Sequence, residues 1–186
     1  ERTYGKQSPY LVASLNTMAD HERKAGNIAR ALAYIARAKD IAKVTPGTAS
    51  PLYHIVLTTE AETFTAAGDA ARARAAFDAV LALEQQTHSA TLPTTLVSRG
   101  DLELAQKAWA NAATYEQQAI TALVATAGKD ALDLWKPLFG LATAQRALDP
   151  KAQVKPLLER ALDRGQKAKR GDADLAPIRD ALSRAQ

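Results

Sequence analysis

Histidines and closely spaced carboxylates are the side chains of this sequence best able to support acid–base chemistry or to bind a metal ion. The three histidines are His21, His54 and His88, and no two of them stand four residues apart on one helical face. Acidic residues occur as pairs two positions apart: Asp20 with Glu22, Glu60 with Glu62, and Asp101 with Glu103. Residues two apart on a helix point in different directions, so these pairs are poor acid–base dyads. We therefore expect no metal site and no catalytic carboxylate pair.

Other motifs of catalysis and cofactor binding are missing from the sequence as well. It contains no cysteine, which excludes disulfides and thiolate ligands. No serine lies in a Gly-x-Ser-x-Gly context, and neither a GxxxxGK[ST] phosphate-binding loop nor a GxGxxG turn occurs. The sequence predicts a non-enzymatic chain that holds no cofactor.

The segments that carry these residues repeat along the chain. The stretch GKQSP at residues 5–9 returns as GTASP at residues 47–51, and Gly26 returns as Gly68, each shifted by 42 positions. Good helix formers fill the segments between, and glycine and proline fall at their ends. Self-similarity at such a period is typical of stacked helical repeats. If the third unit is three residues shorter, Lys107 and Asp149 occupy the equivalent turn positions.

Small and apolar residues that did not define this register also repeat in it. They lie eleven and seven residues before each turn, and five and twelve residues after it. The sets are Leu15, Leu57, Leu96 and Leu138; Ala19, Ala61, Gly100 and Ala142; Ala31, Ala73, Ala112 and Val154; and Ala38, Val80, Ala119 and Ala161. Small residues let two helices approach closely, and leucines fill the space between units. Because one such unit cannot bury its own apolar face, the units must stack.

Serine–proline pairs indicate where helices begin. Ser8 and Ser50 are expected N-caps, because a proline that follows the cap is tolerated in the first turn of a helix. Pro137 and Pro156 stand further inside helical stretches and are expected to mark helix starts or kinks.

In this spacing the chain resembles the tetratricopeptide repeat (TPR) family, over roughly residues 5–167. The family pattern of a turn glycine, an alanine, a large apolar residue and a second alanine is matched by Gly68, Ala73, Phe77 and Val80 and by Gly26, Ala31, Ile35 and Ala38. The third unit, with Lys107, Ala112, Glu116 and Ala119, matches least well. The common TPR unit has 34 residues. A unit of about 42 with Gly-x-x-Ser-Pro linkers is similar to the kinesin-light-chain type, as found in bacterial multidomain signalling proteins.

The resemblance implies an all-α, right-handed superhelical solenoid of about four helix-turn-helix units. We expect a single repeat domain over residues 1–186. Its units are approximately residues 5–46, 47–85, 86–127 and 128–170, with residues 171–186 as a capping or partial-repeat helix. A ragged start and a helix-like end further suggest a piece of a longer protein.

The resemblance also implies a concave groove lined by the first helix of each unit. The ninth position of that helix gives Asp20, Glu62, Asp101 and Thr143, and the three acids would form an acidic row suited to a basic peptide. The fifth position gives Asn16, Thr58, Val97 and Phe139, and the second gives Ala13, Ile55, Thr94 and Lys136. Arg23 and Arg146 are candidates to receive carboxylates of a partner. The chain lacks the full basic set of the two-carboxylate clamp of chaperone-binding TPR proteins, so binding of chaperone tails is not expected.

Several alternatives stay open at this point. The segment from Gly100 also fits a second register, in which Gly100 and Asp101 form the hairpin turn. A HEAT or armadillo array has a similar period, but the small-residue spacing favours TPR. The chain would serve either as a non-catalytic protein–protein interaction scaffold or as the C-terminal regulatory or sensor region of a larger bacterial signalling enzyme, such as a serine/threonine kinase. Self-association through the end helices is a further possibility.

The overall composition limits which class of partner and which cellular compartment we expect. The net charge of +4 equals the basic surplus of the segment from Lys151 to the end. An acidic groove does not favour nucleic acid, so we expect a protein or peptide partner, with basic character. No apolar run reaches the roughly 18 residues of a membrane span, and the first residues do not form a signal peptide. We expect a cytoplasmic chain that contacts no membrane.

Overall fold

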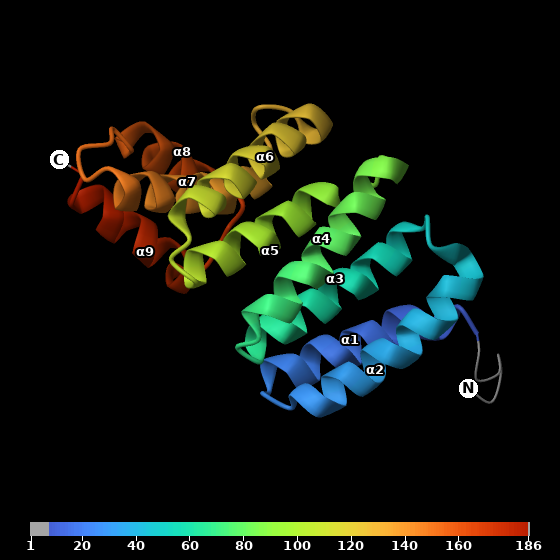
Figure 1. Cartoon of the computed structure of the whole chain (residues 1–186). Coiled ribbons are helices and arrows are strands. Elements are labelled where there is room, and N and C mark those ends of the chain that lie inside the picture. Colours follow the sequence, from blue (N-terminus) through green and yellow to red (C-terminus); the bar gives the residue numbers. More distant parts are fainter. Residues whose placement is uncertain (1–7, 186) are drawn as a thin grey trace. The chain divides into compact units, whose positions relative to one another are not determined.

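The computed structural model describes residues 8–185, in which all regular structure is helical (Figure 1). Within this range nine α-helices follow one another: α1 (Tyr10–Lys24), α2 (Ile28–Ala42), α3 (Pro51–Ala66), α4 (Ala70–Thr87), α5 (Leu92–Ala105), α6 (Trp109–Ala127), α7 (Trp135–Leu148), α8 (Lys155–Lys167) and α9 (Asp172–Ser183). Two short elements, η1 (Lys43–Gly47) and η2 (Leu132–Leu134), precede α3 and α7. The expected all-α class is confirmed.

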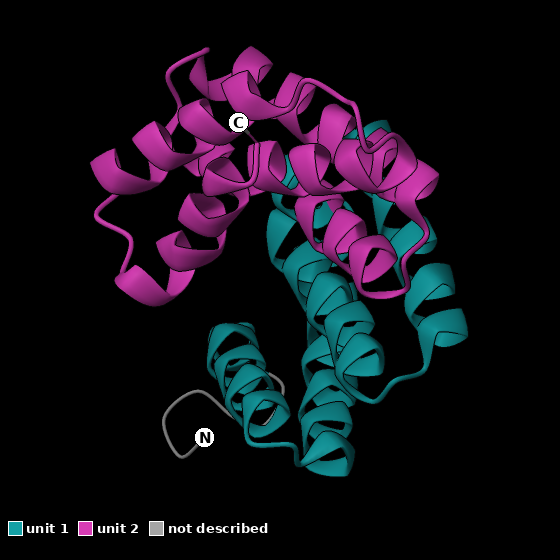
Figure 2. Ribbon diagram, turned by 90° about the vertical axis from the view of Figure 1, so that its left-hand side faces the viewer, with its two compact units in different colours: residues 1–95 teal, residues 96–186 magenta. Residues whose placement is uncertain are grey.

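The chain divides into two compact units, residues 1–95 and residues 96–186 (Figure 2). In unit 1, α1 packs on α2 and α3, and α3 packs on α4. In unit 2, α6, α7, α8 and α9 pack in sequence, each on the next. The expected single domain over residues 1–186, with its four repeat boundaries, stays a prediction.

The same turn closes the first three hairpins. Gly26, Gly68 and Lys107 each have positive φ, of 80°, 75° and 56°. In each turn the N–H of this residue donates to the carbonyl three residues back, and the next N–H donates to the carbonyl five residues back. This is the Schellman motif, which satisfies the last carbonyls of a helix. The turn at Lys107 is therefore confirmed, and the alternative turn at Gly100 is wrong because Gly100 lies inside α5.

The fourth expected turn differs from the others. Asp149 directly follows α7, as the register predicts, but its backbone is extended, with φ −136°. Six residues, 149–154, then lead to α8. The Schellman geometry reappears one helix later, at Lys169, between α8 and α9. The C-terminal helix is thus joined to α8 by the turn that closes the earlier hairpins.

Helix starts agree with the serine and proline signals in part. The Ser50 hydroxyl accepts the Tyr53 N–H at 3.2 Å, and Pro51 is the first residue of α3. Pro156 lies in the first turn of α8. The expected cap at Ser8 is not observed, because α1 begins at Tyr10 without a side-chain cap.

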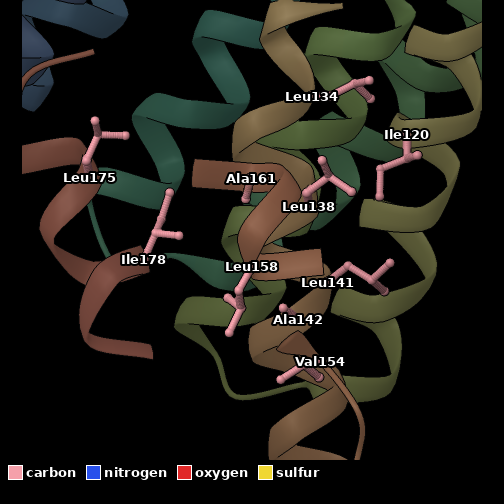
Figure 3. Packing of buried hydrophobic residues seen from close by; sticks show 10 residues of the cluster. All are labelled: Ile120, Leu134, Leu138, Leu141, Ala142, Val154, Leu158, Ala161, Leu175 and Ile178. Atoms are coloured by element: carbon pink, nitrogen blue, oxygen red, sulfur yellow. The ribbon is translucent and has the colours of Figure 1, made fainter. Parts of the chain in front are cut away.

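Each unit has its own apolar core, built in part from the positions that the register selects. Buried residues of unit 1 include Val12, Leu15, Ala19, Ile35, Ala38 and Val56. Those of unit 2 include Leu138, Leu141 and Ala142 of α7, Leu158 and Ala161 of α8, and Leu175 and Ile178 of α9 (Figure 3). All the alanines tested by the register are buried, so small residues do mark the close helix contacts.

Candidate partner-binding groove

In unit 1, the charged residues expected to line the groove on α1 and α3 form ion pairs with one another. The Arg23 guanidinium pairs with Asp20 on its own helix and lies 3.4 Å from the Glu62 carboxylate. Lys24 places its ammonium 2.6 Å from the second Asp20 oxygen. Burial acts to raise the pKa of Asp20, but the hydrogen bonds from Lys24 and Arg23 outweigh it and hold the pKa below its ordinary value. The acids of this unit therefore do not form an uncompensated negative row.

Two further groove residues of unit 1 face inward. The Thr58 hydroxyl donates to the His54 carbonyl at 3.1 Å and lies 3.0 Å from the Thr95 hydroxyl. The Asn16 amide oxygen is buried and has no hydrogen-bond partner among the described residues. Thr58 thus serves the interior of unit 1, and its hydroxyl is not available to a ligand.

In unit 2, four positions of the expected groove meet at one pocket of about 340 Å³. They are Asp101 of α5 and Lys136, Phe139 and Thr143 of α7. The pocket, called the groove pocket below, is completed by Leu104, Trp135, Gly140, Ala173, Asp174 and Pro177. Lys136 and Asp101, both of which line it, form an ion pair with 2.6 Å between Nζ and Oδ2. Val97 is half-buried on α5.

The groove pocket combines an apolar interior with exchangeable charges. Phe139, Leu104 and Pro177 supply apolar surface. The side chains of Lys136 and Asp101 are 46% and 39% exposed. An ion pair with this much exposure contributes about 0–1 kcal/mol, so a charged partner can replace one member at small cost.

Arg146 lies apart from the groove pocket. Its guanidinium donates to the Pro150 carbonyl at 3.1 Å, and it lines a second pocket with Val154 and Leu158. The structure therefore brings Asp101 and Phe139 together but places Arg146 in another site.

A buried polar network in unit 1 was missed by the sequence reasoning. Glu84 of α4 is fully buried and accepts hydrogen bonds from the hydroxyls of Thr91 and Thr95. Burial raises the pKa of Glu84, and these hydrogen bonds oppose the rise without cancelling it. His54, also fully buried, places Nε2 2.9 Å from the Thr48 carbonyl and Nδ1 3.0 Å from the Ser89 hydroxyl. Since a carbonyl only accepts, Nε2 carries the proton and Nδ1 accepts from Ser89.

A second buried glutamate lies in unit 2. Glu116 of α6 is 0% exposed, and neither carboxylate oxygen has a hydrogen-bond partner among the described residues. Room for it comes from two glycines: a Cβ added at Gly100 or Gly140 would lie 2.6 Å or 2.4 Å from Glu116 Oε1. Burial, and to a lesser degree the charge of Asp101, raise the pKa of Glu116 to about 9, so the carboxyl is neutral at pH 7.

Neither glutamate belongs to a metal site. In residues 8–185 no three acidic or histidine side chains gather in a geometry that could hold a metal ion. Within the same residues, no helix is both long and apolar enough to cross a membrane.

Comparison with known proteins identifies the fold. Residues 10–86 match the family model described as tetratricopeptide repeat. A search of curated proteins finds no match. Among solved structures, BtubC (BKLC) from P. vanneervenii is similar, with TM-score 0.78 and 15% identity over 95% of this chain and 76% of that one. A kinesin light chain of Podosopora anserina with nearly identical TPR-like repeats gives TM-score 0.74 and 17% identity over 95% and 86%.

At these identities the structural likeness establishes the fold, and the family match establishes the repeat type over the first two hairpins. TPR repeats are a non-catalytic family that generally mediates protein–protein interaction. The expected helical repeat fold and its likeness to kinesin-light-chain repeats are confirmed. Residues 10–86 are a tetratricopeptide repeat region, and the structure as a whole has the fold of such repeat proteins.

Proposed function

We propose that the chain binds a peptide or protein segment in its groove, and that the groove pocket of unit 2 is the anchor. The observation that supports this proposal is the meeting of four sequence-derived groove positions, Asp101, Lys136, Phe139 and Thr143, at one pocket. An apolar side chain of the partner sits against Phe139. Burying such a side chain contributes about 1.5–3 kcal/mol, which is enough to dominate a short peptide's affinity.

The partner segment carries a basic residue beside the apolar one. Asp101 is half-exposed and shares its charge with Lys136, and Asp174 of α9 supplies a second carboxylate at the same pocket. With two acids and one lysine, the pocket leaves one negative charge for the partner to compensate. A partner lysine or arginine replaces Lys136 at Asp101 and gains Asp174 as a neighbour, so electrostatics favour a basic segment.

The unit 1 positions play a smaller part in this proposal. Asp20, Arg23 and Glu62 already compensate one another, so exchange with a partner gains little there. The alternative role, as a regulatory region of a larger signalling enzyme, stays a prediction.

The test is selection of binding peptides from a random display library on the immobilised chain, followed by fluorescence anisotropy with the enriched peptides. We expect enrichment of an apolar residue beside Lys or Arg. Phe139→Ala should weaken binding at least about tenfold, equivalent to about 1.4 kcal/mol, and Asp101→Asn a few-fold.

Asp163→Asn is the matched control for the charge change, because Asp163 also pairs with a lysine, Lys167 at 2.9 Å, but on α8. It should leave the affinity unchanged. If Phe139→Ala and Asp101→Asn both retain helicity and wild-type affinity, the groove pocket is not the anchor and the proposal is wrong.

A further inference from the structure

A second pocket of unit 2, of about 350 Å³, lies where α7, α8 and α9 approach one another. It adjoins the groove pocket, with which it shares Thr143. Its residues come from the C-terminal half of α7, the segment leading into α8, the start of α8, and the end of α9. Those that matter here are Ala142, Arg146, Val154, Leu158, Ala181 and Arg184.

The interior of this pocket is mainly apolar, and it is open because small side chains stand where larger ones would fill it. Val154 and Leu158 belong to the buried core and form one wall. Ala142 and Ala181 add only a methyl group each from α7 and α9. A concave, mainly apolar space at the lower end of the roughly 300–1,000 Å³ range is typical of small-molecule sites.

The only charged residues that line the pocket in the described chain are arginines. Arg146 donates to the Pro150 carbonyl at 3.1 Å, which is a neutral partner and leaves the positive charge uncompensated. Arg184 lies 2.6 Å from Asp180 on its own helix, so its charge is balanced in part. A pocket with these properties is complementary to a ligand with one negative charge on an apolar body.

We propose that this pocket binds a small aliphatic carboxylate, with the hydrocarbon chain against Val154, Leu158 and the alanines and the carboxylate on the Arg146 guanidinium. Arg146 contributes the larger part of the electrostatic attraction and Arg184 the smaller part. This site shares Thr143 with the peptide anchor but takes a different class of ligand. It gives a role to Arg146, which does not line the groove pocket.

The experiment is a titration of the isotope-labelled chain with sodium octanoate at pH 7, followed by NMR chemical shifts. We expect saturable shifts of the methyl signals of Ala142, Val154 and Ala181. Octylamine, which has the same chain and the opposite charge, should not produce them. Octanol, without a charge, should bind at least about tenfold more weakly, because it cannot form the charge-assisted hydrogen bonds.

Two variants and one control separate the parts of the site. Arg146→Gln should weaken octanoate binding at least about fivefold. Ala181→Leu, which fills the space from α9, should abolish it. Arg160→Gln is the control, since Arg160 also donates to a backbone carbonyl, that of Lys129 at 2.8 Å, and lies outside the pocket. The control should bind as the wild type does.

Three results would overturn the proposal. The first is the absence of saturable shifts up to the solubility limit of octanoate. The second is equal binding by wild type and a folded Arg146→Gln variant. The third is tighter binding of the peptide acetyl-Ala-Ala-Leu, with a free carboxyl end, than of octanoate, which would assign the pocket to a protein C-terminus.

Discussion

Both units bury a glutamate in the second helix of a hairpin, and the two glutamates differ in their hydrogen bonds. Glu84 of unit 1 accepts two threonine hydroxyls at Oε1, and only its Oε2 has no partner among the described residues. Glu116 of unit 2 has no partner for either oxygen among the described residues and fits only because Gly100 and Gly140 lack side chains. An unsatisfied buried polar group costs about 1–3 kcal/mol, whereas a satisfied one is close to neutral or stabilising.

The same contrast holds at the groove. Unit 1 pairs most of its groove side chains internally, although the Asn16 amide oxygen has no partner among the described residues: Thr58 contacts Thr95, and Arg23 lies between two acids. Unit 2 keeps a half-exposed ion pair at the mouth of its groove pocket, and a second pocket lined by arginines. We infer that unit 1 mainly supports the fold and that unit 2 carries the surfaces that a ligand completes.

Replacing each of the two glutamates with methionine should produce the largest difference between the units, measured as the change in the free energy of unfolding. Glu84→Met leaves Thr91 and Thr95 without their buried acceptor and should lower the free energy of unfolding by about 3 kcal/mol. Glu116→Met removes an unsatisfied carboxyl at similar volume and should leave that free energy unchanged or raise it by about 1 kcal/mol. Urea denaturation measures both. Equal losses in the two variants would remove the contrast.

The glycine beside Glu116 offers a more specific test. Gly140→Ala should destabilise by about 2 kcal/mol, because the new Cβ would lie 2.4 Å from Glu116 Oε1 in a packed interior. In a Glu116→Ala background the same change should be neutral or favourable, since alanine is the better helix former. Gly171→Ala, where an added Cβ meets nothing within 4 Å, is the control. An undiminished cost in the Glu116→Ala background would show that the clash lies elsewhere.

Stability should also depend on pH through these carboxyls. The pKa of Glu116 is raised in the fold to about 9 from an ordinary value of 4.5, so the folded state binds more protons between these values. The free energy of unfolding should therefore fall as pH rises through this window, by up to about 1.4 kcal/mol per pH unit. Burial also raises the pKa of Glu84, but hydrogen bonds oppose it. Glu116→Gln should thus flatten the profile more than Glu84→Gln does; the reverse order would contradict the comparison.

The smallest effects are expected at the groove acids. Asp20→Asn should cost up to about 1 kcal/mol, and Asp101→Asn about half as much, because the Asp101–Lys136 pair is the more exposed. The pKa of Asp20 is lowered in the fold, so its contribution is present above the ordinary value of 3.8 and disappears as pH falls below it. Thermal unfolding at pH 7 and pH 3 measures both variants. An equal cost of Asp20→Asn at both values would contradict this assignment.

The sequence predicts the hairpins well because their determinants are local. A positive-φ residue at each turn and small residues at fixed distances from it recur within one repeat, and they place Ala19, Ala61 and Gly100 at buried contacts. The repeat pattern does not predict the connection that begins at Asp149, because a longer loop there replaces the tight turn.

Interactions between helices are harder to predict. Asp20, Glu62 and Asp101 share one register position, but the cations that pair with them come from different positions and partly from other helices. A signal for the buried glutamate does exist. Glu116 stands where the other units have Ile35, Phe77 and Leu158, and Gly100 stands where all three of them have alanine. A glutamate at an apolar position and a glycine inside a helix are each unfavourable alone, but the space left by the glycine accommodates the glutamate side chain.

The most direct test of the claim that unit 2 carries the binding surface is an affinity comparison with one selected peptide. It would be titrated into the wild type, the unit 2 variant Phe139→Ala/Asp101→Lys, and the unit 1 variant Asp20→Lys/Glu62→Lys, with circular dichroism as the check of folding. We predict a loss of at least about tenfold, or 1.4 kcal/mol, for the unit 2 variant, and less than about threefold for the unit 1 variant. A larger loss in the folded unit 1 variant would contradict the claim and place the anchor on α1 and α3.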